Sequence, residues 1–265
     1  MLKPPYTKYN FLHIYNIDRE DIIFDDPDLI GVWEEEDTLL LFFHKNKDFL
    51  IKKHNFKLHF YTAIPYHDWE SGKFIKPFKI GNIFIIPVWE RENFENENKI
   101  IIDPSVVFGT GFHPTTRMIL ESFNNLSKKN KIDSVIDLGC GSGILGIFAG
   151  KKGVKNIVAI DNNNLSFEVT RKNFSLNNVP AKIFHNDIFN FLPYNYDVVF
   201  ANLYYHLLFD LFKNKGFWQS RYYFLSGFVK TMEKEIYNKL NRDIRILDRK
   251  EKDNWVMLLI ENKTI

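Results

Sequence analysis

The chain has 265 residues, of which 45% are hydrophobic and 16% aromatic, and its net charge is +2. This size predicts a globular protein with one domain of about 170 residues and a smaller one. The small net charge does not mark a polyanion binder, and the single cysteine excludes an internal disulfide framework. No run of about 18 apolar residues occurs, and the polar, aromatic residues 1–16 do not form a signal peptide. We therefore expect a cytoplasmic protein.

The first 64 residues alternate between apolar runs and charged turns. Apolar alternation and helical composition predict strands at 11–17, 29–35, 38–44 and 57–64, and a helix at 45–54. The charged piece from Asp18 to Asp28 can hold one further helical turn. The resulting order, β-(α)-β-β-α-β, resembles a small ferredoxin-like α+β domain over residues 1–64.

Residues 65–99 are expected to form a linker region. Proline and glycine punctuate a short helix expected at 68–74 and a strand expected at 83–86. The polar run ERENFENENK, residues 90–99, has almost no apolar content and is the best linker candidate. A polar linker makes hinge motion of the small domain a hypothesis.

The most informative stretch is residues 135–161, VIDLGCGSGILGIFAGKKGVKNIVAID. An apolar run ends in Asp137, breaks into a turn with three alternating glycines and continues with helical spacing, which predicts strand, turn and helix. A second apolar run ends in Asp161 and completes one βαβ unit. Glycine lets the backbone approach a ligand closely, and a helix start offers free N–H groups to an anionic group. The stretch therefore predicts a nucleotide-type cofactor site.

Two cofactors compete for this site, and a glycine turn without any ligand is the third possibility. Gly141, Gly143 and Gly146 spell G-x-G-x-x-G with Asp161 twenty residues after the first glycine, which is a dinucleotide fingerprint. From Asp137, the same turn reads D-x-G-x-G-x-G and resembles the first motif of class I methyltransferases that use S-adenosylmethionine. That resemblance implies that Asp161 binds the two ribose hydroxyls.

A loop with two glycines and several hydroxyls precedes the βαβ unit. It reads FGTGFHPTT over residues 108–116, and its Pro114 can start a helix. Such a loop can fold over a bound cofactor, although a flexible connector with a helix cap has the same composition. His113 is either a contact of the cofactor loop or a structural residue, and we expect the structural role; it is not a metal ligand, because it has no acidic or second histidine partner nearby in sequence.

Three segments in this order, FGTGFHPTT, VIDLGCGSGILGI and FANLYYHLL, resemble the ribosomal protein L-eleven methyltransferase family (PrmA type). The similarity runs from about Asp68 to the C-terminus. It implies a ferredoxin-like substrate-recognition domain, a linker, and a seven-stranded Rossmann-like methyltransferase domain over residues 100–265. It also implies methylation of lysine or N-terminal amino groups of a large-subunit ribosomal protein by a monomeric enzyme. The expected cofactor is S-adenosyl-L-methionine, without a metal and without direct nucleic-acid binding.

The remaining chain fits such a sheet. The pattern predicts a helix at 165–176 after a cap at 162–164, strands at 182–184, 196–201 and 222–225, helices at 206–212 and 231–240, and a terminal antiparallel pair at 244–247 and 255–260. Ser226 and Gly227 are expected to form a turn. Dehydrogenase domains seldom end with such a pair, which favours S-adenosylmethionine over a dinucleotide.

The family resemblance places cofactor contacts along several of these segments. Phe108 and Gly109 would border the methyl-transfer site. An acid after the third strand commonly faces the adenine amino group in this fold, which makes Asp187 the candidate, with a solvated turn residue as the alternative. The full set of expected cofactor contacts is Phe108, Gly109, Thr110, Thr116, Gly139, Gly141, Asp161, Asp187 and Asn202.

Asn202, at the end of the fourth strand, is the catalytic candidate. A methyl sulfonium is already electrophilic, so the enzyme must deliver a neutral amine, whereas a free lysine with a pKa of about 10.4 is charged at pH 7. An amide oxygen can orient the amine without stabilising its charged form as strongly as a carboxylate would. The backbone carbonyl of Leu203 can help. The alternative is an asparagine that only caps a strand.

The residues after Asn202 depart from the family pattern. Tyr204 and Tyr205 stand where small residues are usual, and the run faintly resembles the N-P-P-Y loop of adenine or glutamine methyltransferases without its prolines. Tyr205 either stacks on a planar substrate or packs on the helix at 206–212. Cys140 is expected to fill space rather than to act as a nucleophile. A nucleic-acid amine methyltransferase, a dinucleotide oxidoreductase and a non-catalytic ribosomal-protein binder stay open as rivals.

Overall fold

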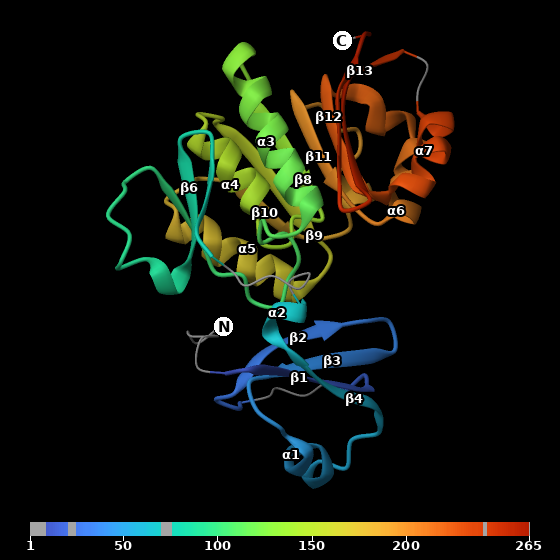
Figure 1. Ribbon diagram of the computed structural model, residues 1–265. Coiled ribbons are helices and arrows are strands. Elements are labelled where there is room, and N and C mark those ends of the chain that lie inside the picture. The colour runs from blue at the N-terminus through green and yellow to red at the C-terminus, as the bar shows by residue number, and fades with distance from the viewer. Residues whose placement is uncertain (1–8, 21–24, 70–75, 241–242, 265) are drawn as a thin grey trace.

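The computed structural model describes residues 9–20, 25–69, 76–240 and 243–264. Figure 1 shows a small sheet at the N-terminus below a larger body of helices around a second sheet. We call these parts the N-terminal sheet and the C-terminal body. Within the described ranges, every helix is too short or too polar to span a bilayer.

The N-terminal sheet has four antiparallel strands in the order β2-β3-β1-β4. The elements are β1 (Phe11–Asp18), β2 (Leu29–Glu34), β3 (Thr38–Phe43), α1 (Asp48–Lys53) and β4 (Leu58–Pro65). This order confirms the ferredoxin-like α+β arrangement, and the strands predicted at 29–35 and 38–44 pair as the antiparallel strands β2 and β3. The helical turn expected between Asp18 and Asp28 falls partly on residues 21–24, outside the described residues.

Alternating side chains of this sheet supply two separate cores. On one face Tyr15, Ile17 and Phe43 pack with Ile51 of α1. On the other face the buried cluster includes Leu12, Ile14, Ile30 and Phe42 together with Val106, which belongs to the C-terminal body. A strand buried on both faces needs apolar residues in both registers, and β1 and β3 have them.

The segment after β4 forms a three-stranded sheet that packs on the C-terminal body. Its elements are α2 (Tyr66–Trp69), β5 (Phe78–Ile80), β6 (Ile83–Pro87), the 3-10 helix η2 (Val88–Glu90) and β7 (Lys99–Ile102). Ile80, Ile83, Ile85 and Ile100 join the large core. The strand predicted at 83–86 is confirmed. The later part of the helix expected at 68–74 lies outside the described residues, and α2 forms the part before it.

The C-terminal body is a seven-stranded sheet in the order β10-β9-β8-β11-β12-β14-β13, with β14 antiparallel to both neighbours. The strands are β8 (Ser134–Leu138), β9 (Asn156–Asp161), β10 (Lys182–His185), β11 (Val198–Asn202), β12 (Tyr222–Val229), β13 (Ile244–Lys252) and β14 (Trp255–Asn262). The helices are α3 (Pro114–Lys129), α4 (Ile144–Lys151), α5 (Asn164–Leu176), α6 (Tyr205–Phe212), α7 (Glu233–Lys239), and the 3-10 helices η3 (Ile188–Phe191), η4 (Lys215–Gln219) and η5 (Lys230–Met232). Helices cover both faces of the sheet, and each face has its own core.

The turn predicted at Ser226 and Gly227 is wrong, because β12 continues through both residues to Val229. The pairing with β14 shifts register between Ser226 and Phe228, which marks a bulge. Gly227 has a φ of +99°, and a Cβ there would lie 1.9 Å from the carbonyl oxygen of Leu203. Glycine is present because two backbones touch, not because the chain reverses.

Two asparagines, Asn173 on α5 and Asn177 at its C-cap, fix the chain that leads from β7 into the loop. Asn177 accepts a hydrogen bond from the N–H of Ile101 and donates one to its carbonyl, both at 2.7 Å. Asn173 makes the same pair of bonds with Asp103 at 2.8 and 3.0 Å and also donates to the carbonyl of Ser142 at 2.9 Å. The helix therefore satisfies the backbone of a segment that would otherwise be an unpaired edge.

Candidate functional site

A cavity of about 450 Å³ lies at the carboxyl ends of the parallel strands, where open α/β sheets place their ligands. Its wall includes six of the residues that the sequence predicted: Phe108, Gly139, Gly141, Asp161, Asp187 and Asn202. The other wall residues are Trp33, Glu34, His113, Thr115, Asn162, Asn163, Ser166, Ile188, Phe189, Leu203, Tyr204, Leu207, Gly227 and Trp255. Four strand ends and the loop before α3 thus converge on one space.

The glycine turn lets three backbone segments meet at this cavity. Gly139 and Gly141 have φ values of +62° and +56°, and a Cβ on them would lie 2.6 Å from a methyl carbon of Leu203 and 2.4 Å from the carbonyl oxygen of Phe108. Ser142 fastens the loop to the turn, because its N–H donates to Phe108 at 3.0 Å and its Oγ donates to the carbonyl of Gly109 at 2.7 Å. The loop is thus bound to the turn rather than a free connector.

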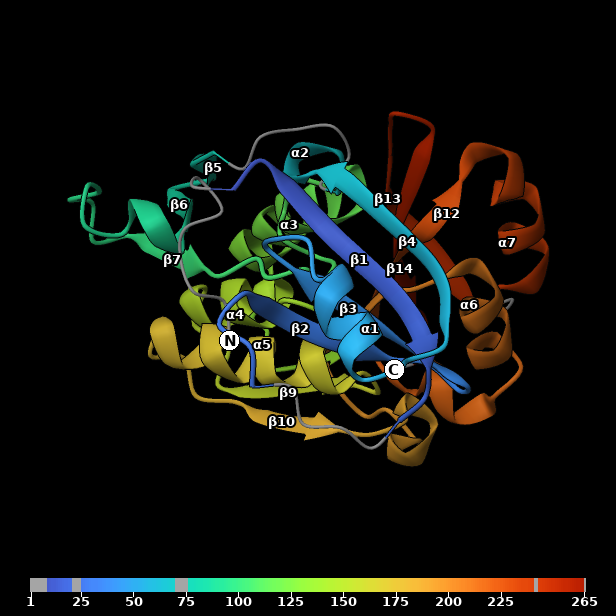
Figure 2. The same ribbon diagram turned by 90° about the horizontal axis from the view of Figure 1, so that it is seen from below.

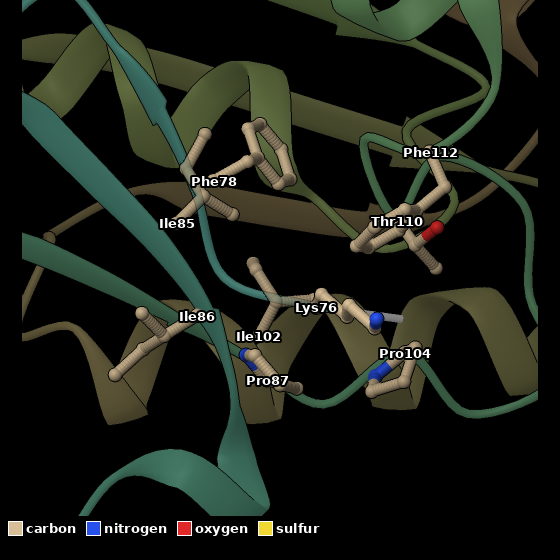
Figure 3. A pocket seen from close by; sticks show the side chains of 9 residues that line it. All are labelled: Lys76, Phe78, Ile85, Ile86, Pro87, Ile102, Pro104, Thr110 and Phe112. Atoms are coloured by element: carbon tan, nitrogen blue, oxygen red, sulfur yellow. The ribbon is translucent and has the colours of Figure 1, made fainter. Parts of the chain in front are cut away.

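Gly109, Thr110 and Thr116 are the predicted contacts that do not line the cavity. Gly109 instead accepts the bond from Ser142. Thr110 is buried beside a different, apolar hollow with Phe112, Phe78 and other residues (Figure 3), whose volume of about 10 Å³ holds no more than one water molecule. Thr116 lies fully buried in the first turn of α3, behind Asn202.

Asn202 is the last residue of β11, and its two side-chain amide atoms differ in whether they have a hydrogen-bond partner. The Nδ2 atom donates to Oγ1 of Thr116 at 3.3 Å. The Oδ1 atom is buried and has no hydrogen-bond partner among the described residues. Buried acceptors are almost always paired, so an unpaired one on a cavity wall is a place for a donor that arrives with a ligand.

Asp161 is held at the opposite part of the cavity by two backbone donors. Its carboxylate accepts from the N–H of Gly141 and from the N–H of Asn163, both at 2.9 Å. Burial raises the pKa of Asp161 above its usual range, and the two hydrogen bonds and nearby His185 oppose that rise. Asp137, fully buried one strand away, also has a pKa raised by burial.

Asp187, Tyr204 and Tyr205 differ in whether they support the fold, line the cavity or do both. Asp187 caps η3 by accepting from the N–H of Phe189 at 2.9 Å, while it also lines the cavity. Tyr205 packs on Phe209 of α6, with ring centroids 4.3 Å apart, and its hydroxyl donates to Glu235. Tyr204 is 77% exposed and is the tyrosine that faces the cavity. Of the two alternatives for Tyr205, the structure therefore shows packing.

Several wall residues were not among the predicted cofactor contacts. Asn163 was expected only as part of a helix cap, and its Oδ1 does cap α5 by accepting from the N–H of Ser166 at 3.1 Å. Its buried Nδ2, however, has no hydrogen-bond partner among the described residues. The ring of His113 lies between Phe108 and Trp255, with centroids 4.8 and 4.7 Å away. Trp33 comes from the N-terminal sheet, and no local pattern links it to this site.

Cys140 lies inside the glycine turn and is buried. Its Sγ is 3.3 Å from Oγ1 of Thr170, and burial raises the pKa of the thiol well above its usual range. A thiol in this state is a poor nucleophile, which supports the space-filling interpretation. In the described part of the chain, no three His, Cys, Asp or Glu residues are grouped closely enough to hold a metal ion.

A seven-stranded sheet in which only β14 is antiparallel to its neighbours, a glycine turn after β8 and an acid at the end of β9 define a class I methyltransferase fold. The model of one protein family, described as Ribosomal protein L11 methyltransferase (PrmA), matches residues 7–263. The chain belongs to that family. This membership decides against the dinucleotide interpretation of Gly141, Gly143 and Gly146.

Individual relatives agree with this assignment. The chain is 36% identical over 203 residues to the ribosomal protein L11 methyltransferase of Thermoanaerobacter sp. (strain X514), an alignment that covers 74% of this chain and 65% of that protein, less than two thirds of its length. It is 34% identical over 209 residues to the protein of that name from Dictyoglomus turgidum, covering 77% and 69%. A crystal structure of ribosomal protein L11 methylase from Lactobacillus delbrueckii subsp. bulgaricus superposes with a TM-score of 0.59 at 23% identity, over 71% of this chain and 99% of that one. The last comparison supports the fold.

Proposed function

We propose that this protein is an S-adenosylmethionine-dependent methyltransferase that modifies lysine or N-terminal amino groups of ribosomal protein L11. The observation that carries the proposal is the buried, unpaired Oδ1 of Asn202, a residue that lines the cavity one strand away from the glycine turn. Family membership supports the reaction class, and the names of the relatives support the substrate.

The residues of the cavity fit S-adenosylmethionine. Asp161 keeps a carboxylate available to ribose hydroxyls, and the buried Nδ2 of Asn163 supplies a donor beside it. Asp187 and Phe189 offer a carboxylate and an aromatic ring at the end of β10, where the adenine would lie. The cavity volume is within the usual range of small-molecule sites. When bound, the cofactor supplies a methyl group on a cationic sulfur.

The protein's part in the chemistry is to bind and orient a neutral amine. Asn202 Oδ1 would accept one N–H of that amine, and the bond from Asn202 Nδ2 to Thr116 would keep the oxygen facing the substrate. The amide carries no charge, so it favours the ammonium form less than a carboxylate would. The carbonyl of Leu203, held against Gly227, can accept a second N–H. Phe108 and Tyr204, both at least half exposed, would border the entry of the substrate side chain.

We also propose that residues 1–64 recognise the substrate protein and that residues 65–99 connect them to the catalytic residues 100–265. Five large apolar side chains of the N-terminal part are more than a third exposed, and they are Phe11, Phe49, Leu58, Phe60 and Tyr61. Three of them belong to β4, which is one of the two edge strands of the sheet among the described residues, the other being β2. Exposed apolar side chains on an edge strand support a protein-binding surface.

The test is transfer of labelled methyl groups from S-adenosylmethionine to ribosomal proteins from a strain that lacks this gene, followed by intact mass measurement. We expect label on one large-subunit protein, L11, and peptide mapping then locates the amines. Label in RNA instead would support the nucleic-acid rival. Binding of L11 without transfer of label would support the non-catalytic binder, and no cofactor binding would refute the whole proposal.

A further inference from the structure

Two residues of the cavity wall belong to the N-terminal sheet. Trp33 and Glu34 stand at the end of β2 and face the same space as Asp161 and Asn202. Strand β2 lies against α5, as Figures 1 and 2 both show. The approach is close, because a Cβ on Gly31 would lie 2.7 Å from the methyl carbons of Leu165 in α5. The N-terminal sheet therefore reaches the ligand cavity directly.

Trp33 belongs to an apolar cluster that also includes residues next to two parts of that wall. Its half-buried side chain packs against a cluster that contains Val106 and in which Leu165 also takes part. Val106 stands two residues before Phe108, and Leu165 stands next to Ser166, and both of these neighbours line the cavity. Trp33 thus packs in the same apolar cluster as residues of the loop before α3 and of the start of α5.

We propose that Trp33 is a cofactor-binding residue supplied by the N-terminal sheet, packing on the ribose side of the ligand. This inference rests on the proposed function, because it takes the ligand to be the nucleoside part of S-adenosylmethionine. The start of α5 follows Asp161 and Asn163, which are the proposed ribose contacts, and Trp33 lies on that side because it shares a cluster with Leu165 and stands two residues after Gly31, which approaches Leu165. An indole supplies a large apolar surface and excludes water from the hydrogen bonds beneath it.

Glu34 makes a useful contrast within the same strand. Its carboxylate forms an ion pair with Arg19 at 3.0 Å, and its side chain is 45% exposed. Arg19 also donates to the carbonyl of Glu35 at 3.0 Å. An exposed and already paired charge contributes little to binding in high-dielectric surroundings. The contact that matters for affinity is therefore the ring of Trp33.

The proposal couples the cofactor to the placement of the N-terminal sheet. A ligand that gains contact with Trp33 binds more tightly when β2 is docked on α5, so it stabilises the docked arrangement. By thermodynamic reciprocity, a protein substrate that draws the sheet away from α5 weakens cofactor binding by the same factor. Cofactor affinity then reports on the N-terminal sheet although most cavity residues belong to the C-terminal body.

The test measures S-adenosylhomocysteine binding to the full chain by titration calorimetry. We expect Trp33→Ala to weaken binding five- to tenfold, Trp33→Phe to lose less, and Glu34→Gln to stay within about twofold. Trp69→Ala is the matched control: Trp69 packs in the same cluster, against Phe42 at 5.4 Å between ring centroids, but does not line the cavity. We expect it to bind within twofold of the wild type.

Each other result has a distinct meaning. If the wild type binds S-adenosylhomocysteine and Trp33→Ala binds it with the same affinity, this inference is overturned and the proposed function is left intact. If the wild type does not bind it, the proposed function itself is overturned. An equal loss in Trp69→Ala refutes a direct contact by Trp33. If Trp33→Ala fails to fold, hydrogen exchange of the wild type replaces it: the ligand should slow exchange of the amides of β2, and unchanged exchange overturns the inference.

Discussion

The cavity has two polar anchors, Asp161 and Asn202, and they differ in how far the protein itself satisfies them. Asp161 receives two backbone N–H bonds at 2.9 Å before any ligand is present. Asn202 is fixed only through its Nδ2, and its buried Oδ1 is unpaired within the described residues. In the proposed function, Asp161 would be a binding residue that the backbone already holds in place, and Asn202 would offer its free acceptor to the substrate.

This difference has an energetic side. A buried acceptor without a partner costs about 1–3 kcal/mol of folding stability. The incoming amine would remove that cost by donating to Asn202 Oδ1, so part of the binding energy is realised at the reacting centre. The carboxylate of Asp161 has no such deficit, and its two backbone hydrogen bonds fix its own position, where the proposal places the ribose. Substitutions at the two residues should therefore affect different kinetic constants.

The largest effect is expected for Asn202→Ala. Loss of the oriented acceptor should lower turnover by about 100-fold, because a misplaced nucleophile costs that much, while cofactor affinity changes less than about threefold. Steady-state kinetics and calorimetry separate the two quantities. Asn202→Asp is the control for charge, and it should stay slow because a carboxylate holds the amine in its charged form. Normal turnover in Asn202→Ala would remove the residue from the mechanism.

Asp161→Ala should show the opposite pattern. Without the carboxylate, cofactor affinity should weaken by at least about tenfold, since two charge-assisted hydrogen bonds to ribose hydroxyls are lost. Turnover at saturating cofactor should fall much less. Titration calorimetry with S-adenosylhomocysteine measures the first quantity. An unchanged dissociation constant would show that the ribose is held elsewhere.

The titration of Asp161 gives a third test, in which cofactor affinity and folding stability should change in opposite directions as the pH falls. Burial raises the pKa of this carboxyl, so protonation begins at a higher pH than for an ordinary aspartate. As pH falls through that pKa, the carboxylate is lost as an acceptor and cofactor affinity should decrease. The stability that Asp161 contributes to the ligand-free protein should instead increase, because the buried charge disappears.

Asp161→Asn is the control for this pH dependence, because His185 and Asp137 also interact with the carboxyl group. Calorimetry from about pH 8 to about pH 5 covers the range in which an ordinary histidine titrates. Over this range, cofactor affinity should fall more steeply in the wild type than in Asp161→Asn. Parallel curves would assign the titration to a neighbouring group.

The smallest effect is expected for Thr116→Val. This change removes the acceptor of the bond from Asn202 Nδ2 but keeps the shape of the buried side chain. Turnover should fall about three- to tenfold, the worth of one hydrogen bond, with cofactor affinity unchanged. Thr116→Ser keeps the hydroxyl and should behave like the wild type. A loss of cofactor affinity as large as that of Asp161→Ala would make Thr116 a direct contact instead.

Much of the site could be predicted because its residues follow strands. The glycine turn, Asp161 and Asn202 each stand at the carboxyl end of a predicted parallel strand, and such ends meet at one edge of a sheet. Hydrophobic periodicity located those strands, so the positions of these residues followed. The ferredoxin-like strand order also followed from the pattern of short apolar runs.

What could not be predicted depends on contacts between distant segments. Trp33 reaches the cavity only because β2 docks on α5, and nothing near it in sequence encodes that contact. Thr110 belongs to the same loop as Phe108 but lies in the other pocket, since alternation along an irregular loop has no fixed period. Asn163 was predicted as a cap, and its unpaired Nδ2 became visible only in three dimensions.

Gly227 illustrates how a residue outside the chemistry limits sequence change. Its Cα touches the backbone carbonyl of Leu203, and that carbonyl cannot move aside as a flexible side chain would. Any side chain at position 227 would push the end of β11, and Asn202 with it, out of place. A saturation library scored for activity would then show that position 227 tolerates no large side chain, although a selection of residues by their role in the mechanism would leave it out. Alanine and serine have the smallest side chains, so they would measure how small a displacement of Asn202 still lowers activity.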